Sequence, residues 1–169
     1  FKLTEKTEYD KTLLPQNVQD HCKKQESIAA AIELLNMGVL GLRYEQNKPF
    51  ADNCFVSISH SGDMVAVCKS ENPVGIDIEK IRPVSLKLAK RVCTPNELNY
   101  VFGTDDADFD AEYPPEVTDR FFEIWTIKEA YFKCIGTGIT DFFAVDALNG
   151  NFSKLKIIEN GCIIHIVTL

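Results

Sequence analysis

The feature that most constrains this chain is an uninterrupted helical stretch in its second half, from Trp125 to Lys133. Neither Gly nor Pro follows before Gly136, and large apolar side chains recur at helical spacing. At about 100° per residue, Trp125, Glu129 and Lys133 fall in one stripe, and Lys128 projects from a neighbouring one. A surface ion pair is the ordinary explanation, because Glu before Lys at this spacing stabilises a helix by roughly 0.3–0.5 kcal/mol.

Residues 74–79 predict a strand that carries two carboxylates on one face. Side chains alternate along a strand, so Asp77 and Glu79 share one face while Ile76 and Ile78 share the other. Two neighbouring carboxylates repel one another unless a cation lies between them. A hard divalent ion such as Mg²⁺ takes oxygen ligands, typically one or two protein carboxylates together with phosphate oxygens.

Together, the strand and the helix predict a metal–phosphate site. Glu129 could add a third carboxylate to Asp77 and Glu79, and the ammonium groups of Lys128 and Lys133 could meet phosphate charge beside it. The expected ion is Mg²⁺, with Mn²⁺ left open as an alternative.

The two stretches, in this order, resemble the signature pair of the 4'-phosphopantetheinyl transferases. The matching segments are residues 75–79 (GIDIE) and 125–133 (WTIKEAYFK), with Arg91, Thr94 and Glu97 between them. Upstream, residues 47–49 (NKP) and 57–61 (SISHS) are similar to the Gly-Lys-Pro and Ser-His-Ser elements of that family. The upstream elements point to the larger, Sfp-type branch, in which a single chain holds two similar halves.

This resemblance implies an activity and a first set of site residues. The activity is transfer of the 4'-phosphopantetheine arm of coenzyme A to a serine of an apo acyl or peptidyl carrier protein, which releases adenosine 3',5'-bisphosphate. Asp77, Glu79 and Glu129 would hold the metal. Lys128 and Lys133 would bind phosphate and stabilise the leaving group.

The resemblance also implies which residues bind the nucleotide of coenzyme A. Lys23 and Lys24 would hold its 3'-phosphate, Ser59 and His60 would contact its phosphates, and Lys48 would lie near the same ligand. Where the family commonly carries an Arg one or two turns further along the first helix, this chain has alanines. Two exposed, solvated lysines are the alternative explanation for Lys23 and Lys24.

Glu97 has two predicted roles. Thr94, Pro95 and Glu97 match an N-cap, a Pro at N1 and a Glu at N3, which is the pattern of a capping box. The resemblance instead implies that Glu97 lies near the metal or accepts the proton of the carrier serine. Both roles stay open at this point.

The expected fold is α+β, with two similar halves at residues 1–72 and 73–169, each a helix packed on an antiparallel sheet. A helix is expected from about Val18 to Gly38, and a loop over residues 103–119. Asn149-Gly150 and Asn160-Gly161 predict hairpin turns. The expected strands are residues 1–3, 40–44, 54–59, 64–68, 74–79, 142–147, 152–158 and 162–167, and further helices are expected over residues 85–92 and from Thr94.

Composition indicates which classes of partner to expect and in which cellular compartment the protein works. The net charge of −7 argues against nucleic acid as a partner. No apolar run approaches the ~20 residues that span a bilayer, and we expect neither a signal peptide nor a membrane partner. The six cysteines show no zinc spacing, which favours a reducing cytoplasm. We expect a monomer.

Two other functions fit parts of the pattern. A magnesium-dependent phosphohydrolase of nucleotides or coenzyme A would also cluster carboxylates and lysines. A non-catalytic module that binds carrier proteins would keep the fold, and its expected mark is the loss of one of the three carboxylates, all of which are present here.

Overall fold

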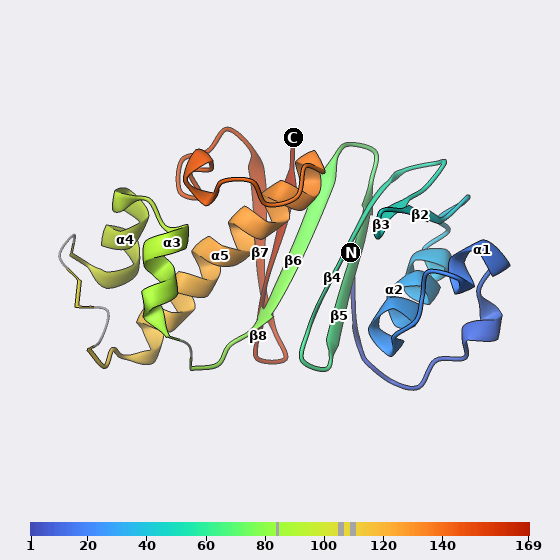
Figure 1. Cartoon of the computed structure of the whole chain (residues 1–169), viewed down its shortest axis with the longest axis horizontal. Coiled ribbons are helices and arrows are strands. Elements are labelled where there is room, and N and C mark those ends of the chain that lie inside the picture. Colours follow the sequence, from blue (N-terminus) through green and yellow to red (C-terminus); the bar gives the residue numbers. More distant parts are fainter. Residues whose placement is uncertain (84, 105–106, 109–110) are drawn as a thin grey trace.

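The computed structural model describes residues 1–83, 85–104, 107–108 and 111–169, and it confirms the α+β class (Figure 1). The first part of the chain holds β1 (Lys2–Glu5), η1 (Lys11–Leu13), α1 (Gln16–Gln19), α2 (Gln25–Asn36), β2 (Arg43–Glu45), β3 (Lys48–Phe50), β4 (Phe55–Ser61) and β5 (Met64–Ser70). The second holds β6 (Val74–Lys80), η2 (Leu86–Leu88), α3 (Ala89–Val92), α4 (Pro95–Phe102), α5 (Pro115–Ile135), η3 (Phe142–Ala144), β7 (Ser153–Glu159) and β8 (Cys162–Thr168).

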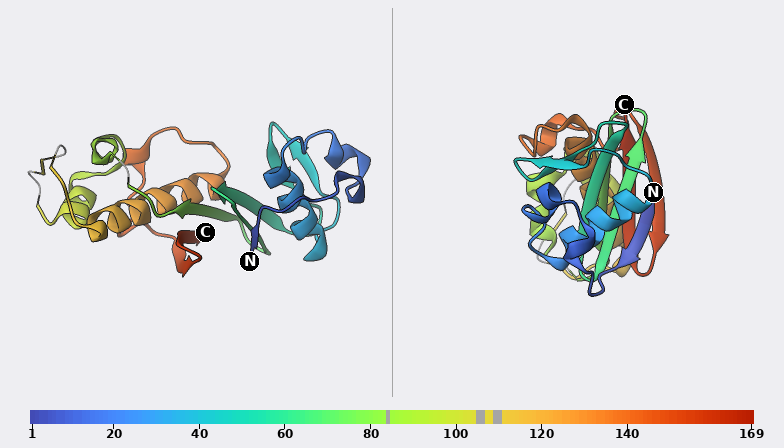
Figure 2. Two further views of the ribbon diagram at one scale, coloured as in Figure 1. Left: turned by 90° about the horizontal axis from the view of Figure 1, so that it is seen from below. Right: turned by 90° about the vertical axis from the view of Figure 1, so that its right-hand side faces the viewer.

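Two three-stranded antiparallel sheets form the centre of the molecule, in the orders β1-β5-β4 and β6-β8-β7, and β2 and β3 form a separate hairpin. Val65 and Val67 of β5 pack with α2 in one core, whereas α5 packs over β6 and β8. The two sheets lie side by side along the long axis, with β4 and β6 between the helices (Figure 2). None of the helices in the described ranges is long and apolar enough to cross a membrane.

Strands β4 and β6 adjoin one another through serine side chains, although their backbones belong to different sheets. Alternate hydroxyls of β4 accept hydrogen bonds from alternate backbone N–H groups of β6. The bonds run from Ile76 N to Ser57 Oγ (3.1 Å), from Ile78 N to Ser59 Oγ (3.4 Å) and from Lys80 N to Ser61 Oγ (3.0 Å). We call these three bonds the serine ladder. Both strands run in the same direction along it.

Most of the predicted strands are present, but the prediction for residues 142–147 is wrong. Asp141 caps a 3-10 turn there by accepting from Phe143 N. Asn149-Gly150 is therefore no hairpin turn, and the carboxylate of Asp146 instead accepts from the backbone of the residues after it. Asn160-Gly161 does join β7 to β8, with φ values of +52° and +69° as a type I′ turn requires.

Two helix boundaries also differ from the prediction. The expected helix from Val18 is divided, because Lys24 has an extended backbone and caps α2 together with Ser27. The loop predicted over residues 103–119 ends at Pro114, since Pro115 starts α5 at N1, where its missing N–H costs nothing. Positions 105–106 and 109–110 of that loop lie outside the described residues.

Gly75 sets how closely β6 approaches α5. A Cβ atom at this position would lie 1.8 Å from the carbonyl oxygen of Ala130 and 2.6 Å from the backbone nitrogen of Cys134. Both neighbours are helix backbone, so neither can swing aside as a side chain could. The contact places the residues that follow Gly75 directly beneath the helix.

We predict that Gly75→Ala destabilises the protein by about 3 kcal/mol, at the upper end of the usual cost of overpacking, because β6 and α5 must separate. Urea unfolding would measure this. Gly161→Ala is the matched control, since nothing lies within 4 Å of a Cβ there and only the positive φ is strained. Equal free energies of unfolding for the two variants would contradict the prediction.

Candidate functional site

Asp77 lies at the centre of an acidic cluster on the α5 side of β6. Its side chain is buried, and its Oδ1 accepts from Ser59 Oγ (2.8 Å) and from Lys133 Nζ (2.7 Å). Its Oδ2 is buried without a hydrogen-bond partner. Burial raises the pKa of Asp77, and the Lys133 ammonium opposes that rise. An unpartnered buried carboxylate oxygen is costly, and a cation would relieve that cost.

Glu79 lies two residues along the same face of β6, as the strand alternation predicts. Its Oε2 accepts from Ser61 Oγ (2.8 Å) and lies 3.7 Å from an Arg82 guanidinium nitrogen. Burial raises its pKa, as does the nearby charge of Asp77, whereas Ser61 and Arg82 lower it. Glu79 and Asp77 thus repel each other across a partly buried face.

Glu129 of α5 completes the cluster. Burial is the largest cause that raises its pKa, to about 7, and the negative charges of Asp77 and Glu79 add to it while Lys133 acts in the opposite direction. The Glu129 carboxyl is therefore close enough to Asp77 and Glu79 for their charges to affect it. In the described parts of the chain, no three His, Cys, Asp or Glu side chains stand ready as a group to hold a metal ion. Lys133 already occupies Asp77 Oδ1, where an ion would otherwise bind.

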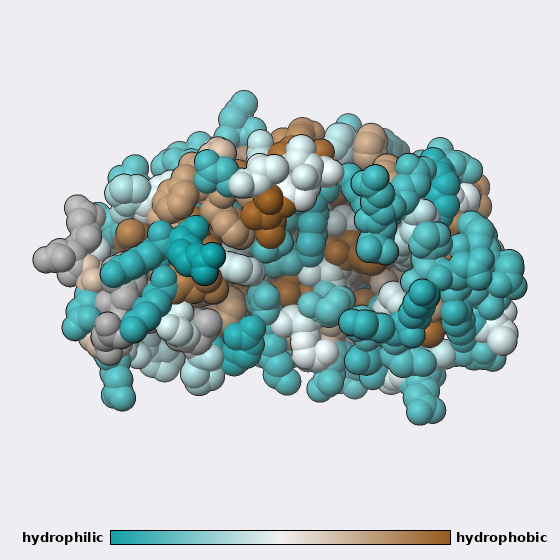
Figure 3. All heavy atoms as spheres, viewed as in Figure 1, coloured by the Kyte–Doolittle hydropathy of each residue, from teal (hydrophilic) through white to brown (hydrophobic). Residues whose placement is uncertain are grey.

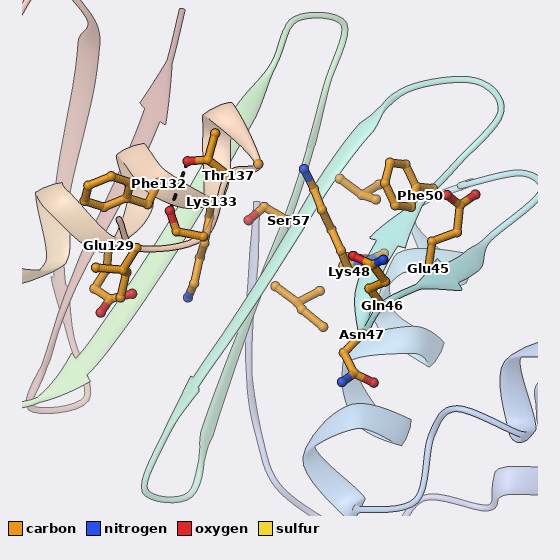
Figure 4. Close-up of a pocket in the computed structure, with 16 residues that line it drawn as sticks. Glu45, Gln46, Asn47, Lys48, Phe50, Ser57, Glu129, Phe132, Lys133 and Thr137 are labelled. Carbon is orange, nitrogen blue, oxygen red and sulfur yellow. Dashed lines mark hydrogen bonds between the residues drawn. The ribbon is translucent and has the colours of Figure 1, made fainter. Parts of the chain in front are cut away.

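A pocket of about 760 Å³ opens beside this cluster, within the range usual for small-molecule sites. Lys48 of β3 and Lys133 of α5 lie on opposite sides of it, with Ser57 of β4 between them (Figure 4). Glu129 and Phe132 line the α5 side. The pocket thus brings two ammonium groups and the carboxylates of Glu45 and Glu129 to one opening.

Lys48 is directed into the pocket by the β2–β3 hairpin, whose turn residues Gln46 and Asn47 have positive φ. Its Nζ lies close to Gly136, the C-cap of α5, where a Cβ atom would come within 2.0 Å of it. The C-terminal end of a helix carries partial negative charge, which favours an ammonium group there. Over the same face, hydrophilic residues cover the α1–α2 end and hydrophobic ones gather toward the centre (Figure 3).

Lys24 and His60, two of the residues predicted to bind the nucleotide, lie near the N-terminal end of α2. Glu26 in the first turn of α2 pairs with Lys6 (3.1 Å) and with Lys24 (4.0 Å). Its pKa is lowered chiefly by its own backbone N–H, and His60 contributes to the lowering. Lys23 is exposed beside Lys24. The residues predicted to bind the nucleotide are therefore divided. Lys23, Lys24 and His60 lie near the start of α2, whereas Lys48 lines the pocket.

Lys128 does not project into the pocket. Its side chain is fully buried, and its Nζ donates to the backbone carbonyls of Val92 and Phe142 (2.8 Å each) and pairs with Glu97 Oε2 at 2.6 Å. These contacts use all three donors of the ammonium group. Lys128 thus connects α5 to the end of α3, to α4 and to the segment around η3.

Glu97 is equally buried, and the capping box predicted for it is confirmed. Its Oε2 accepts from Thr94 N (2.6 Å), and Oε1 accepts from Ala147 N (2.8 Å). Both oxygens are therefore occupied by groups of this chain. The catalytic roles implied for Glu97 and Lys128 stay predictions, and from this geometry each would require the buried ion pair to open.

Two residues of the site lay outside the predicted set. Ser61 donates to Glu79, and Arg82 lies close to the same carboxylate. The signal for Ser61 was present, since Ser57, Ser59 and Ser61 alternate along one strand and must share a face. Arg82 follows the end of β6, where sequence does not fix the direction of a side chain.

The fold and the site define a class: an α+β protein with clustered carboxylates beside an open pocket that two lysines line. The model of the 4'-phosphopantetheinyl transferase superfamily matches residues 73–162, more than half of the chain. The chain belongs to this superfamily. The matched region contains β6 and α5, which together supply all three carboxylates of the cluster.

Curated proteins similar to this chain carry the same family name. A 4'-phosphopantetheinyl transferase of Bacillus subtilis is 34% identical over 107 residues, which cover 60% of this chain and 44% of the relative. The 4'-phosphopantetheinyl transferase gsp of Aneurinibacillus migulanus is 37% identical over 64% of this chain and 43% of its own length. The 4'-phosphopantetheinyl transferase AcpT of Escherichia coli is 38% identical over 61% and 52%, respectively. The matched segment thus spans about half of each relative.

Proposed function

We propose that this protein transfers the 4'-phosphopantetheine group of coenzyme A to a serine of an apo acyl or peptidyl carrier protein, with adenosine 3',5'-bisphosphate as the other product. The observation that carries the proposal is the placement of Asp77 and Glu79 close enough to Glu129 to raise its pKa, with Lys133 bonded to Asp77, beside a pocket that Lys48 also lines. Membership of the superfamily supports it.

The cluster offers the carboxylate oxygens that Mg²⁺ prefers, and Mn²⁺ would use the same donors, although the three side chains would have to converge on the ion. Asp77, Glu79 and Glu129 would hold the ion, and the unpartnered Asp77 Oδ2 is the first oxygen available to it. When bound, the ion would supply positive charge against the pyrophosphate of coenzyme A. Lys133 would then exchange its contact with Asp77 for one with phosphate.

The remaining cations would bind and orient the substrate. Lys133 and Lys48, on opposite sides of the pocket, would hold the phosphates between them, so that electrostatic positioning does most of the work of transfer. Lys24 and His60 near the start of α2, with Lys23 beside them, would bind the 3'-phosphate. Glu97 and Lys128 would act at a distance, by fixing α4 and α5 around the site.

We predict that Mg²⁺ binding releases a proton near pH 7 and weakens as the pH falls below it. A metal ligand must be ionised, and the Glu129 carboxyl has a pKa of about 7. Titration calorimetry in buffers of different protonation enthalpy would measure the proton release. In Glu129→Gln this release should disappear, and a release equal to that of the native protein would contradict the assignment.

The same pKa has a consequence for folding in the absence of metal. The folded protein keeps the Glu129 proton between the ordinary value of 4.5 and about 7, whereas the unfolded chain has lost it. Because the folded state binds more protons in this window, the contribution of Glu129 to stability falls as the pH rises through it.

Intact-mass measurement of apo carrier proteins after incubation with coenzyme A and Mg²⁺ tests the proposed function. The expected result is a carrier that gains one phosphopantetheine group at its serine. A parallel reaction without carrier would reveal a phosphohydrolase by release of phosphate from coenzyme A. No mass gain on carriers of the acyl and peptidyl types, with the chain folded and bound to coenzyme A, would contradict the proposal.

A further inference from the structure

Two of the three hydroxyls of the serine ladder make a second hydrogen bond, to a carboxylate of β6. A serine hydroxyl accepts hydrogen bonds and donates one of its own. Ser59 accepts from Ile78 N and donates to Asp77 Oδ1, and Ser61 accepts from Lys80 N and donates to Glu79 Oε2. In both cases the carboxylate belongs to the residue immediately before the bonded N–H group. One hydroxyl therefore fixes a backbone position and the neighbouring carboxylate together.

Ser57 repeats the backbone contact without a carboxylate. It accepts from Ile76 N at 3.1 Å, and the residue before Ile76 is Gly75, which has no side chain. Ser57 can therefore serve as a control for Ser61 within the same ladder. Ser57 and Ser61 both connect β4 to β6, and only Ser61 also orients an acidic side chain.

Orientation matters more for Glu79 than for Asp77. Asp77 has a short side chain that Lys133 holds as well, at 2.7 Å from the same oxygen. Glu79 has one more rotatable bond and is only partly buried, and besides Ser61 the guanidinium of Arg82 lies 3.7 Å from its carboxylate. Of these two contacts, the hydrogen bond from the Ser61 hydroxyl is the shorter, at 2.8 Å.

We propose that Ser61 is a positioning residue, which aims the carboxylate of Glu79 at a divalent cation from across the junction of the two sheets. The proposal deepens the function given above and rests on its metal site. Partners that orient ligand carboxylates typically contribute about 10- to 100-fold to metal affinity. We expect a loss of that size when the Ser61 hydroxyl is removed.

The test uses Mn²⁺ as the probe, with free Mn²⁺ followed by electron paramagnetic resonance on the full chain, alone and with coenzyme A. Ser61→Ala should weaken Mn²⁺ binding about 10- to 100-fold. Because Ser57 also lines the pocket, Ser57→Ala is compared in the absence of coenzyme A, where it should lower the unfolding temperature to a similar extent and leave Mn²⁺ affinity unchanged. Ser61→Thr should restore affinity, because Thr keeps the hydroxyl and suits a strand.

A double-variant comparison separates positioning from general loosening of the junction. In a Glu79→Gln background, Ser61→Ala should have no further effect on Mn²⁺ affinity, since the side chain through which it acts is gone. An undiminished effect in that background would overturn the proposal. So would native affinity in Ser61→Ala, an equal loss in Ser57→Ala, or no saturable Mn²⁺ binding by the native chain.

These outcomes can be told apart from failure of the proposed function. If the native chain binds Mn²⁺ but never modifies a carrier protein, the transferase assignment fails, and the serine variants still test the role of Ser61. If carriers are modified and the affinities of Ser57→Ala and Ser61→Ala do not differ, the positioning role alone is wrong.

Discussion

Asp77→Asn is expected to give a folded protein that transfers phosphopantetheine at least about 1,000-fold more slowly. The substitution removes the most buried carboxylate of the cluster and the unpartnered oxygen with it. A metal ion contributes several kcal/mol of charge stabilisation to such a transfer, and about 4 kcal/mol corresponds to three factors of ten in rate. Asp77→Ala and Glu129→Gln should have effects of the same order.

The fold should survive these substitutions, because removing one charge from a crowded acidic cluster relieves repulsion. Initial rates of carrier-protein modification would be measured by mass spectrometry. Circular dichroism and urea unfolding would show whether each variant is folded. Asp63→Asn, on the exposed turn between β4 and β5, is a matched control that should transfer at the native rate. A folded Asp77→Asn variant with native activity would remove Asp77 from the metal site.

Lys128→Met is expected to lower the free energy of unfolding by about 3–5 kcal/mol. The substitution leaves the Glu97 carboxylate buried without its cation, and that is the costly way to break a buried ion pair. Adding Glu97→Gln should recover a large part of the loss, since Gln removes the charge and its side-chain oxygen can still accept from a backbone N–H.

A double-mutant cycle in urea would give the coupling energy of the pair, for which we expect at least about 1 kcal/mol. Coenzyme A affinity, measured where each variant is folded, distinguishes a positioning role from direct contact. Native stability in Lys128→Met, together with a large loss of coenzyme A binding, would show that Lys128 faces the substrate and that the buried pair does not persist in solution.

Sequence was sufficient to predict which site residues share a face within a single strand or helix. Alternation placed Asp77 and Glu79 on one face of β6, and helical spacing placed Glu129 and Lys133 in one stripe of α5. The two elements meet where Lys133 Nζ of α5 lies 2.7 Å from Asp77 Oδ1 of β6. What sequence did not supply is which stripe of α5 turns toward the core.

Lys128 illustrates that limit. It lies one residue before Glu129 and therefore about 100° around the helix, on a side that packs against α3 and α4. Its partner Glu97 comes from a distant capping box, and periodicity carries no information on such a pairing. The same holds for residues 142–147, where a short apolar run without a period cannot be separated from a turn.

The serine ladder also means that residues of both sheets determine the geometry of the acidic cluster. Its carboxylates extend from β6 and α5, while the hydroxyls that aim two of them are fixed to β4. Any ligand that shifts one sheet against the other must change the aim of Asp77 and Glu79 as well. A cation held by these carboxylates would therefore oppose a movement between the two sheets.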